Sequence, residues 1–435
     1  MTLPRQTLFW AVSIGHFTID LFNSIGPVLL AFLSGHILQM TNTQIGFAVS
    51  AYQLAGALSQ PLFGYLADRS GGRWIGAGGV TWTVSMLMLS LMLSTTGEYV
   101  LMLIPFVAAA LGSGAFHPVG AMHASEADKT RVASNLSVFF LMGQSGSAVG
   151  PVLVGILLDS AATHNVIFTS ALGPAFSGVL AERGVVSPVL AISLLALPAV
   201  LLMLFRMPNK HHYSHASSAR AAAATSAGET AAPLLIKPLL LLALVVLLRS
   251  LANPGLTAFV PRLLQLKGWS AAEYGLITSA FWLSSGIAGV IFGQLADRYS
   301  SRMIIAITLF LSAPALFLLP TAEGAFVLVL ALLTGAFTGG SHSLIVVMSQ
   351  RLMPARKGFA SGAILGFIFG TGAVGTLVIG TLSDQIGLLT AFQIVAGVML
   401  LTGALALLLP RDKARVIHSV PAADSASAEP VASQA

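Results

Sequence analysis

The stretch IGFAVSAYQLAGALSQPLFGYLADRSGGR, which covers Ile45–Arg73, decides the organisation of this chain, because the chain contains it twice. A shift of 229 residues lays it without a gap on YGLITSAFWLSSGIAGVIFGQLADRYSSR, which covers Tyr274–Arg302. Further along, a shift of 225 residues places Asp159 on Asp384. An internal repeat of this extent predicts two halves of the same architecture in parallel orientation.

The composition places both halves in a membrane. Of the 435 residues, 56% are hydrophobic and only 8% are charged, whereas about a quarter of the residues in a soluble domain are charged. A membrane-spanning helix needs about 20 mostly apolar residues, so the chain has room for roughly a dozen. We therefore expect an all-α integral membrane protein with about twelve transmembrane helices in two pseudo-symmetric six-helix halves.

Apolar runs between charged or turn-rich breaks predict the positions of these spans. In the first half they lie at about 8–33, 44–66, 74–94, 99–122, 132–157 and 187–206. In the second half they lie at about 238–260, 271–296, 303–320, 325–348, 358–383 and 388–409. The expected parts of the chain are an N-terminal half at 1–206, a linker at 207–236, a C-terminal half at 237–410 and a disordered tail at 411–435.

The basic residues predict the orientation of the chain. If the N-terminus is cytoplasmic, the external segments contain only Arg183, Arg262 and Lys267, and nearly all other Lys and Arg residues fall on the cytoplasmic side. This bias predicts a multi-pass protein of the bacterial inner membrane with both termini and the linker in the cytoplasm. A span at 165–181 would invert the bias, so we expect that apolar stretch to lie at the external surface.

The loop after the second span reads GYLADRSGGR, and its repeat reads GQLADRYSSR. Both copies resemble the signature loop of the major facilitator superfamily, a resemblance that implies the fold of that superfamily and a latch at the cytoplasmic gate. The simpler alternative is that the arginines only anchor the loop in the cytoplasm. The gate-motif residues are Gly64, Asp68, Arg69, Arg73, Gly293, Asp297, Arg298 and Arg302.

The fifth span carries GQSGSAVGPVLVG, in which small residues allow another helix to pack closely and the proline distorts the backbone. This segment resembles the fifth-helix motif of drug:proton antiporters, and ordinary close packing is the alternative. Its motif residues are Gly143, Gly146, Gly150, Pro151 and Gly155.

The first span, together with GSGAFHPVGAMHAS at 112–125, resembles the fosmidomycin-resistance branch of the superfamily. That resemblance implies a phosphonate-like solute.

Polar and charged residues in the middle of a membrane-spanning helix are costly, so each of them calls for a structural or functional explanation. An Asp or Arg at the middle of a span costs about 2.5–3.5 kcal/mol to insert, so Asp20 and Arg249 should face a cavity or each other. The two residues correspond under the 229-residue shift, and the resemblance to the superfamily implies that the first helices of the two halves face each other across the cavity. We therefore expect the two residues to pair there, for gating and coupling or as a purely structural pair. His117 and His342 are also repeat mates, and an imidazole titrates at about pH 6.5, which suits proton exchange.

The candidate site follows from these residues. For proton coupling the candidates are Asp20, His16 and His117; for substrate binding they are Arg249, Asn23, Tyr52, Gln53, Asn253, Trp282 and His342. Further candidates for the cavity lining are Gln60, Asn135, Gln144 and Ser341.

We expect a secondary transporter that exports a small polar or anionic compound in exchange for protons. The alternative is a proton-coupled uptake symporter or a facilitator. A membrane enzyme or receptor is less consistent with the sequence, because no GK[ST] phosphate loop and no His-Glu-x-x-His helix occurs. No cysteine is present, the basic residues form no stripe for nucleic acid, and no cofactor or metal is implied. The expected partners are the solute, protons and the lipid bilayer, and the expected state is a monomer.

Overall fold

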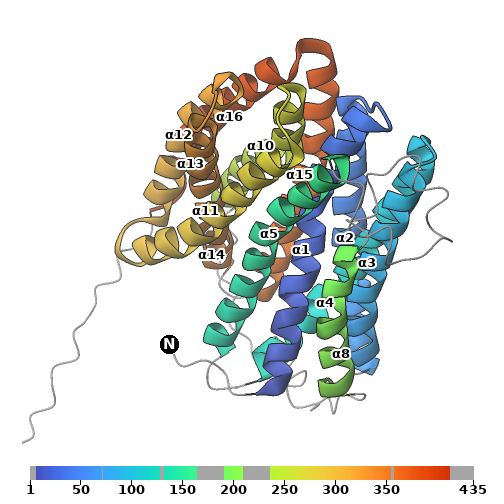
Figure 1. The fold of residues 1–435 in the computed structure, drawn as a ribbon. Helices are drawn as coiled ribbons and strands as arrows, with labels where there is room; N and C mark the ends of the chain where they lie inside the picture. Colours follow the sequence, from blue (N-terminus) through green and yellow to red (C-terminus); the bar gives the residue numbers. More distant parts are fainter. Residues whose placement is uncertain are drawn as a thin grey trace, which may run out of the picture.

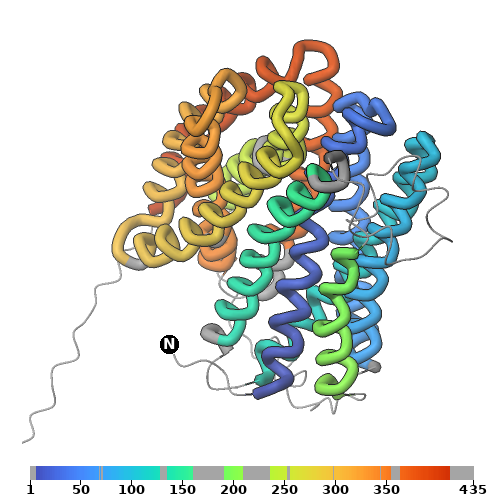
Figure 2. Tube along the Cα trace, in the orientation of Figure 1, coloured from blue at the N-terminus to red at the C-terminus, as the bar shows by residue number. Residues whose placement is uncertain are grey.

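A computed structural model describes residues 6–70, 72–127, 132–163, 191–208, 236–353 and 357–411, and every regular element within these ranges is a helix. Figure 2 traces their path along the chain. The expectations for the linker, the tail and the stretch 165–181 fall mostly or wholly outside the described residues. The expected all-α fold is confirmed.

Within its described residues, the N-terminal half has five long helices and one shorter one. They are α1 (Thr7–His36), α2 (Asn42–Ser70), α3 (Arg73–Ser94), α4 (Tyr99–Glu126), α5 (Val132–Thr163) and α8 (Ala196–Arg206), the last preceded by a 3-10 turn at Ile192–Leu195. Gly72 separates α2 from α3 with a φ of 80°, a conformation that glycine adopts without steric cost.

The C-terminal half repeats this order. Its helices are α10 (Ile236–Leu266), α11 (Ala271–Arg298), α12 (Ser301–Leu318), α13 (Phe326–Gly340), α14 (His342–Leu352), α15 (Lys357–Ile386) and α16 (Leu388–Ala406). The span expected at 325–348 is present as one apolar segment, Phe326–Leu352, and a one-residue break at Ser341 divides it into α13 and α14. The sequence Gly-Gly-Ser at this point has low helix propensity, and the carbonyl of Thr338 bonds to a side chain of α10.

Ten of the described helical segments are long and apolar enough to cross a membrane, and the shorter apolar helix Ile192–Arg206 adds to them. Helix α2 is as long as the others but more polar, since it carries Tyr52, Gln53 and Gln60. Large apolar side chains such as Leu58 and Phe205 are more than three-quarters exposed on the helix surfaces. Such exposure suits a protein whose outer surface faces lipid.

The two halves meet along two seams, α2 against α15 and α5 against α11, and α1 also contacts α10 (Figure 1). We call the end of the bundle at which α1 begins the motif end, because both gate motifs lie there. The other end, where α1 ends and α2 begins, is the opposite end. At the motif end, added methyl groups on Gly289, Gly293, Gly366 and Gly370 would meet no atom within 4 Å. These four positions therefore have open space beside them.

Candidate functional site

Three ionisable side chains meet inside the N-terminal half. On α1, Nε2 of His16 lies 3.2 Å from Oδ2 of Asp20, one helical turn away. From α4, Nε2 of His117 lies 3.2 Å from Oδ1 of the same carboxylate. We call these three residues the His-Asp-His cluster. The structure thus brings together the three residues that the sequence predicts for proton coupling.

The backbone fixes the orientation of both imidazoles. Nδ1 of His16 donates to the carbonyl of Phe139 on α5, and Nδ1 of His117 donates to the carbonyl of Ser113 on α4, each at 2.8 Å. The ring of Phe139 stacks on His16 with centroids 4.0 Å apart. Because Nδ1 of each ring is held by a carbonyl, both rings present Nε2 to Asp20.

A hydrogen-bond network of neutral groups continues from the carboxylate. Nδ2 of Asn23 donates to Oδ1 of Asp20 at 3.2 Å and to Oγ of Ser113 at 2.9 Å. The hydroxyl of Tyr52 on α2 donates to Oδ1 of Asn23 at 2.5 Å. The side chain of Asn23 therefore connects the cluster to α2 and α4. A change in protonation at Asp20 can alter hydrogen bonds on α1, α2 and α4.

The fifth-helix motif makes room for the cluster. A methyl group on Gly143 would lie 2.5 Å from Cε1 of His16 and 2.6 Å from Oδ2 of Asp20. Methyl groups on Gly146 and Gly150 would overlap the carbonyls of Phe17 and Leu21 on α1. These glycines let α5 approach α1 so closely that the cluster is enclosed between them.

A buried cation lies in the C-terminal half. Arg249 on α10 is 1% exposed, its Nε donates to Oγ of Ser341 at 2.8 Å, and its Nη2 donates to the carbonyl of Thr338 at 2.6 Å. The guanidinium thus binds at the break between α13 and α14, and His342 begins the second of these helices. No carboxylate among the described side chains forms an ion pair with Arg249.

The expected pairing of Asp20 with Arg249 does not occur in this structure. Asp20 is bonded to the two histidines and Asn23, and Arg249 is bonded to the interrupted helix of its own half. The physical reason is local: the interruption at Ser341 supplies a hydroxyl and a carbonyl that satisfy the guanidinium without a carboxylate. The two charged sites are separate networks.

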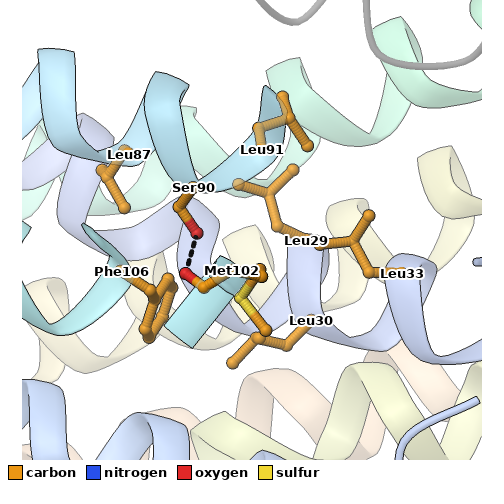
Figure 3. Close-up of a pocket in the computed structure, with 8 residues that line it drawn as sticks. All are labelled: Leu29, Leu30, Leu33, Leu87, Ser90, Leu91, Met102 and Phe106. Carbon is orange, nitrogen blue, oxygen red and sulfur yellow. Dashed lines mark hydrogen bonds between the residues drawn. The ribbon is translucent and has the colours of Figure 1, made fainter. Parts of the chain in front are cut away.

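The remaining candidates occupy less defined positions. Gln53 and Trp282 are partly buried, and Trp282 contacts Phe281 edge to face at 5.9 Å between centroids. Asn253 lies on α10, but its side chain falls outside the described part of the structure. A small apolar cleft between α1, α3 and α4 is lined by leucines, Met102 and Phe106, with Ser90 bonded to the Met102 carbonyl (Figure 3). None of the predicted site residues lines that cleft.

The gate motifs bind mostly within their own halves. The last arginine of each copy donates to a carbonyl just beyond the last described helix of its half, Arg73 to Met207 after α8 at 2.5 Å and Arg302 to Leu409 after α16 at 3.2 Å. The guanidinium of Arg69 lies over the ring of Tyr65, 4.3 Å from its centroid. The side chains of Asp68 and Asp297 fall outside the described part of the structure, so their role as latch stays a prediction.

At the opposite end, both seams are closed by the same pair of contacts. Asp384 at the end of α15 accepts the backbone N–H groups of Asn42 and Thr43 at 2.9 and 2.8 Å. Asp159 at the end of α5 accepts the N–H groups of Ala271 and Ala272 at 2.8 and 2.9 Å. Each carboxylate therefore caps the first turn of a helix in the other half.

Glycines and hydroxyls bring the backbones together along the same seams. An added methyl group on Gly46 would lie 2.9 Å from the carbonyl of Thr376, and its repeat mate Gly275 meets the carbonyl of Pro151. Ser50 donates to the carbonyl of Ala373 at 2.6 Å, and its repeat mate Ser279 accepts the N–H of Val152 at 2.9 Å. We call these contacts, together with the two carboxylate caps, the opposite-end seal.

Sequence reasoning found the repeat of Asp159 and Asp384 but assigned neither residue a role. The sequence did contain a signal for this role, namely two carboxylates at equivalent helix ends of the two halves. Such carboxylates can each cap a helix of the other half if the halves meet at that end. Ser113 and Thr338 were also missed, since one contributes a hydroxyl to Asn23 and the other only a carbonyl. Ligand atoms of the His-Asp-His cluster lie within 4.8 Å of one another, a spacing that would also suit a metal ion.

Two six-helix halves with an internal repeat, a closed seal at one end and buried charges between the ends define a membrane transporter rather than an enzyme. The chain belongs to the Major Facilitator Superfamily, whose sequence profile matches residues 12–171 and 239–432. The predicted superfamily is confirmed.

The chain is similar along most of its length to bacterial proteins of this family. It is 27% identical over 404 residues to the fosmidomycin resistance protein of Escherichia coli (strain K12), covering 93% of this chain and 92% of that protein. It is 26% identical over 419 residues to the uncharacterized MFS-type transporter YfnC of Bacillus subtilis (strain 168), covering 94% of each.

Solved structures share the fold. A bacterial homologue of the human lysosomal transporter Spinster, in an inward-facing and occupied conformation, superposes with a TM-score of 0.75 at 14% identity, over 94% of this chain and 97% of that one. A D-xylose-proton symporter superposes with a TM-score of 0.71 at 13% identity, over 93% and 97%. These neighbours support the fold alone.

Proposed function

We propose that the protein is a proton-coupled exporter of a small anionic compound of the phosphonate type. The observation that carries the proposal is the separation of two buried sites: a His-Asp-His cluster that can hold protons, and an Arg249 that has no carboxylate partner among the described residues. A buried guanidinium without a counter-ion favours an anionic ligand, since its planar fork matches a phosphonate or carboxylate with two N–H donors.

The orientation of the chain gives this arrangement a direction. With both termini cytoplasmic, as the positive-charge bias favours, the opposite-end seal lies on the external side, and the motif end, where four glycines have open space beside them, faces the cytoplasm. This structure is then the state that takes up solute from the cytoplasm. Labelling of Ser217→Cys with an impermeant maleimide in inverted vesicles but not in intact cells is the expected result, and labelling in intact cells would contradict the orientation.

The similarity to a fosmidomycin resistance protein supports export of a phosphonate. In the proposed cycle, protons reach Asp20 and its histidines from outside, the bundle reopens to the cytoplasm, and the protons leave as the anion binds Arg249. Alternating access then carries the anion outward. The protein works in the inner membrane as a monomer, with the halves 1–206 and 237–410 moving as units about the linker 207–236.

The test is transport into inverted vesicles that carry an inside-acid proton gradient, with fosmidomycin compared against a lipophilic cation. We expect uptake of fosmidomycin and its loss in Arg249→Ala, with Arg249→Lys partly active because it keeps the charge without the fork. Lys237→Ala is the matched control, an exposed basic residue on the same helix. Transport of the cation alone, unaffected by Arg249→Ala, would contradict the anion proposal.

A proton-coupled uptake symporter is the second candidate. Its support is that a neighbour with the same fold is a D-xylose-proton symporter. The direction of the proton gradient separates the two candidates: an exporter accumulates solute in inverted vesicles when the lumen is acidic, and a symporter loses solute from them when the lumen is acidic.

A further inference from the structure

The hydrogen-bond donors of the His-Asp-His cluster can be counted from its contacts. A backbone carbonyl accepts hydrogen bonds and cannot donate them, so Nδ1 of His16 and Nδ1 of His117 each carry a hydrogen toward the carbonyls of Phe139 and Ser113. The hydroxyl of Ser113 lies farther from Nδ1 of His117, at 3.3 Å, and can accept from the same N–H. In a neutral imidazole the other nitrogen, Nε2, is then a bare acceptor. Each Nε2 faces a carboxylate oxygen of Asp20 at 3.2 Å, and a carboxylate is also only an acceptor.

Two acceptors in contact require a hydrogen between them. The two contacts use different oxygens, Oδ2 for His16 and Oδ1 for His117, so a single proton on Asp20 can satisfy only one of them. The amide of Asn23 donates to Oδ1 but cannot supply a hydrogen to either imidazole nitrogen along these contacts. The observed geometry therefore accommodates two protons, one between Asp20 and each histidine.

No other described charge alters this count. From α2, Tyr52 reaches the cluster only through Asn23, and from α5 the neighbouring groups are Gly143 and the rings of Phe139 and Phe140. From α10, the ionisable residue at membrane depth is Arg249, which bonds to Ser341 and Thr338. With both protons the cluster carries one positive charge, and without them it carries one negative charge.

We infer that the His-Asp-His cluster binds two protons, one on each histidine arm of Asp20, and that the transporter exchanges two protons for each solute. The inference rests on the proposed proton-coupled function and specifies its stoichiometry. Each proton bonds to Nε2 or is shared with the facing carboxylate oxygen, and both leave to the cytoplasmic water as the solute binds. His16 and His117 thus contribute equally, although they lie on different helices.

The test uses the full chain in proteoliposomes at zero membrane potential, with fosmidomycin as the probe solute. Two exchanged protons support a solute gradient of about 100-fold per pH unit, and one proton supports about tenfold. Ionisation of the solute itself changes the gradient supported by the variant and by the original protein by the same factor. The quantity to compare is therefore the ratio of the two supported gradients. We expect His16→Gln and His117→Gln each to lower the supported gradient about tenfold per pH unit, since Gln keeps an N–H donor without titrating.

His36→Gln is the matched control. His36 lies on the same helix as His16 and also bonds through Nδ1 to a backbone carbonyl, that of Phe32, but it forms no ion pair with a carboxylate among the described residues. It should leave the gradient unchanged. If the original protein showed no proton dependence, the proposed function would fail; if it were proton-coupled and either histidine variant kept the full gradient, only the two-proton inference would fail.

A second measurement covers variants that do not transport. In the full chain labelled with ¹⁵N-histidine, nuclear magnetic resonance distinguishes a bare Nε2 from one that carries or shares a proton. We expect neither His16 nor His117 to show a bare Nε2 at neutral pH, with signals assigned by the two Gln variants. A bare Nε2 on either ring would overturn the inference, and so would signals or transport that depend on added Zn²⁺ and disappear with a chelator.

Discussion

Asp159 and Asp384 occupy equivalent positions in the two halves, and each accepts two backbone hydrogen bonds from the first turn of a helix in the other half. The first N–H groups of a helix have no partner within the helix, and the helix dipole favours a negative charge beside them. The carboxylates therefore stabilise the closed opposite end, and they can do so only while that end is closed.

We expect Asp159→Asn and Asp384→Asn to shift the protein toward the state that is open at the opposite end. Loss of the charged cap costs about 1 kcal/mol at each site, which is about a fivefold change in the ratio of closed to open molecules. Spin labels on Thr96→Cys and Glu323→Cys, one in each half at that end, should report a larger share of long distances. The absence of native cysteine makes the labelling specific.

Glu98→Gln is the control for this experiment. Glu98 lies at the same end and precedes α4, but its side chain makes no capping hydrogen bond. A distance distribution that changes as much in Glu98→Gln as in Asp384→Asn would attribute the effect to net charge and not to the caps.

Gly380→Ala should prevent the same end from closing. The added methyl group would lie 2.5 Å from the carbonyl of Asn42 and 3.0 Å from the ring of Phe259, and the carbonyl belongs to a helix backbone that cannot move alone. Overpacking of this kind costs about 1–3 kcal/mol, so we expect about a tenfold loss of transport with normal insertion. Gly397→Ala, where the methyl group meets nothing within 4 Å, should transport normally. Equal activity of both variants would contradict the role of the glycine contact.

Gly143→Ala should damage the proton site without touching an ionisable group. Its methyl group would push against His16 and Asp20, so either the histidine or the carboxylate must move from its hydrogen bond. We expect solute exchange to persist while the dependence of transport on the pH gradient falls about tenfold, a change measured in proteoliposomes with and without the gradient. Gly289→Ala is the matched control, because nothing lies within 4 Å of its added methyl group. Full pH dependence in Gly143→Ala would argue against a cluster that needs this contact.

Arg73→Gln should loosen the end of α8. The guanidinium donates to the carbonyl of Met207, and a charge-assisted bond from an arginine that remains partly exposed contributes about 1 kcal/mol. Hydrogen exchange around Met203–Met207 should therefore be about fivefold faster, with α16 unchanged. Arg69→Gln removes the neighbouring arginine, which lies over Tyr65, and should leave the exchange of α8 as it is. Faster exchange in both variants would point to a general effect of charge.

The sequence predicts the fold well because its signals are long and repeated. Apolar runs of membrane length and the two copies of the motif around Asp68 and Asp297 are enough for the two-half architecture. The turn-by-turn spacing of His16 and Asp20 also predicts their contact, since residues four apart share a helix face. His117 joins them from α4, where its repeat relation to His342, rather than helical periodicity, singled it out.

The partner of Arg249 could not be predicted in the same way. Symmetry suggested Asp20, but the guanidinium binds a carbonyl that is available because the helix is interrupted at Ser341. Backbone acceptors carry no sequence signature, and neither does the position at which two helices cross. For the same reason the caps at Asp159 and Asp384 required the structure, since the groups they bind are main-chain N–H groups.

The opposite-end seal consists of backbone atoms, small residues and two carboxylates, none of which belongs to the His-Asp-His cluster or contacts Arg249. Substitutions near Arg249 can therefore change which solute is recognised without altering how the protein closes. Related transporters that descend from one ancestral gene can in this way evolve different solute specificities while they keep the same closing contacts.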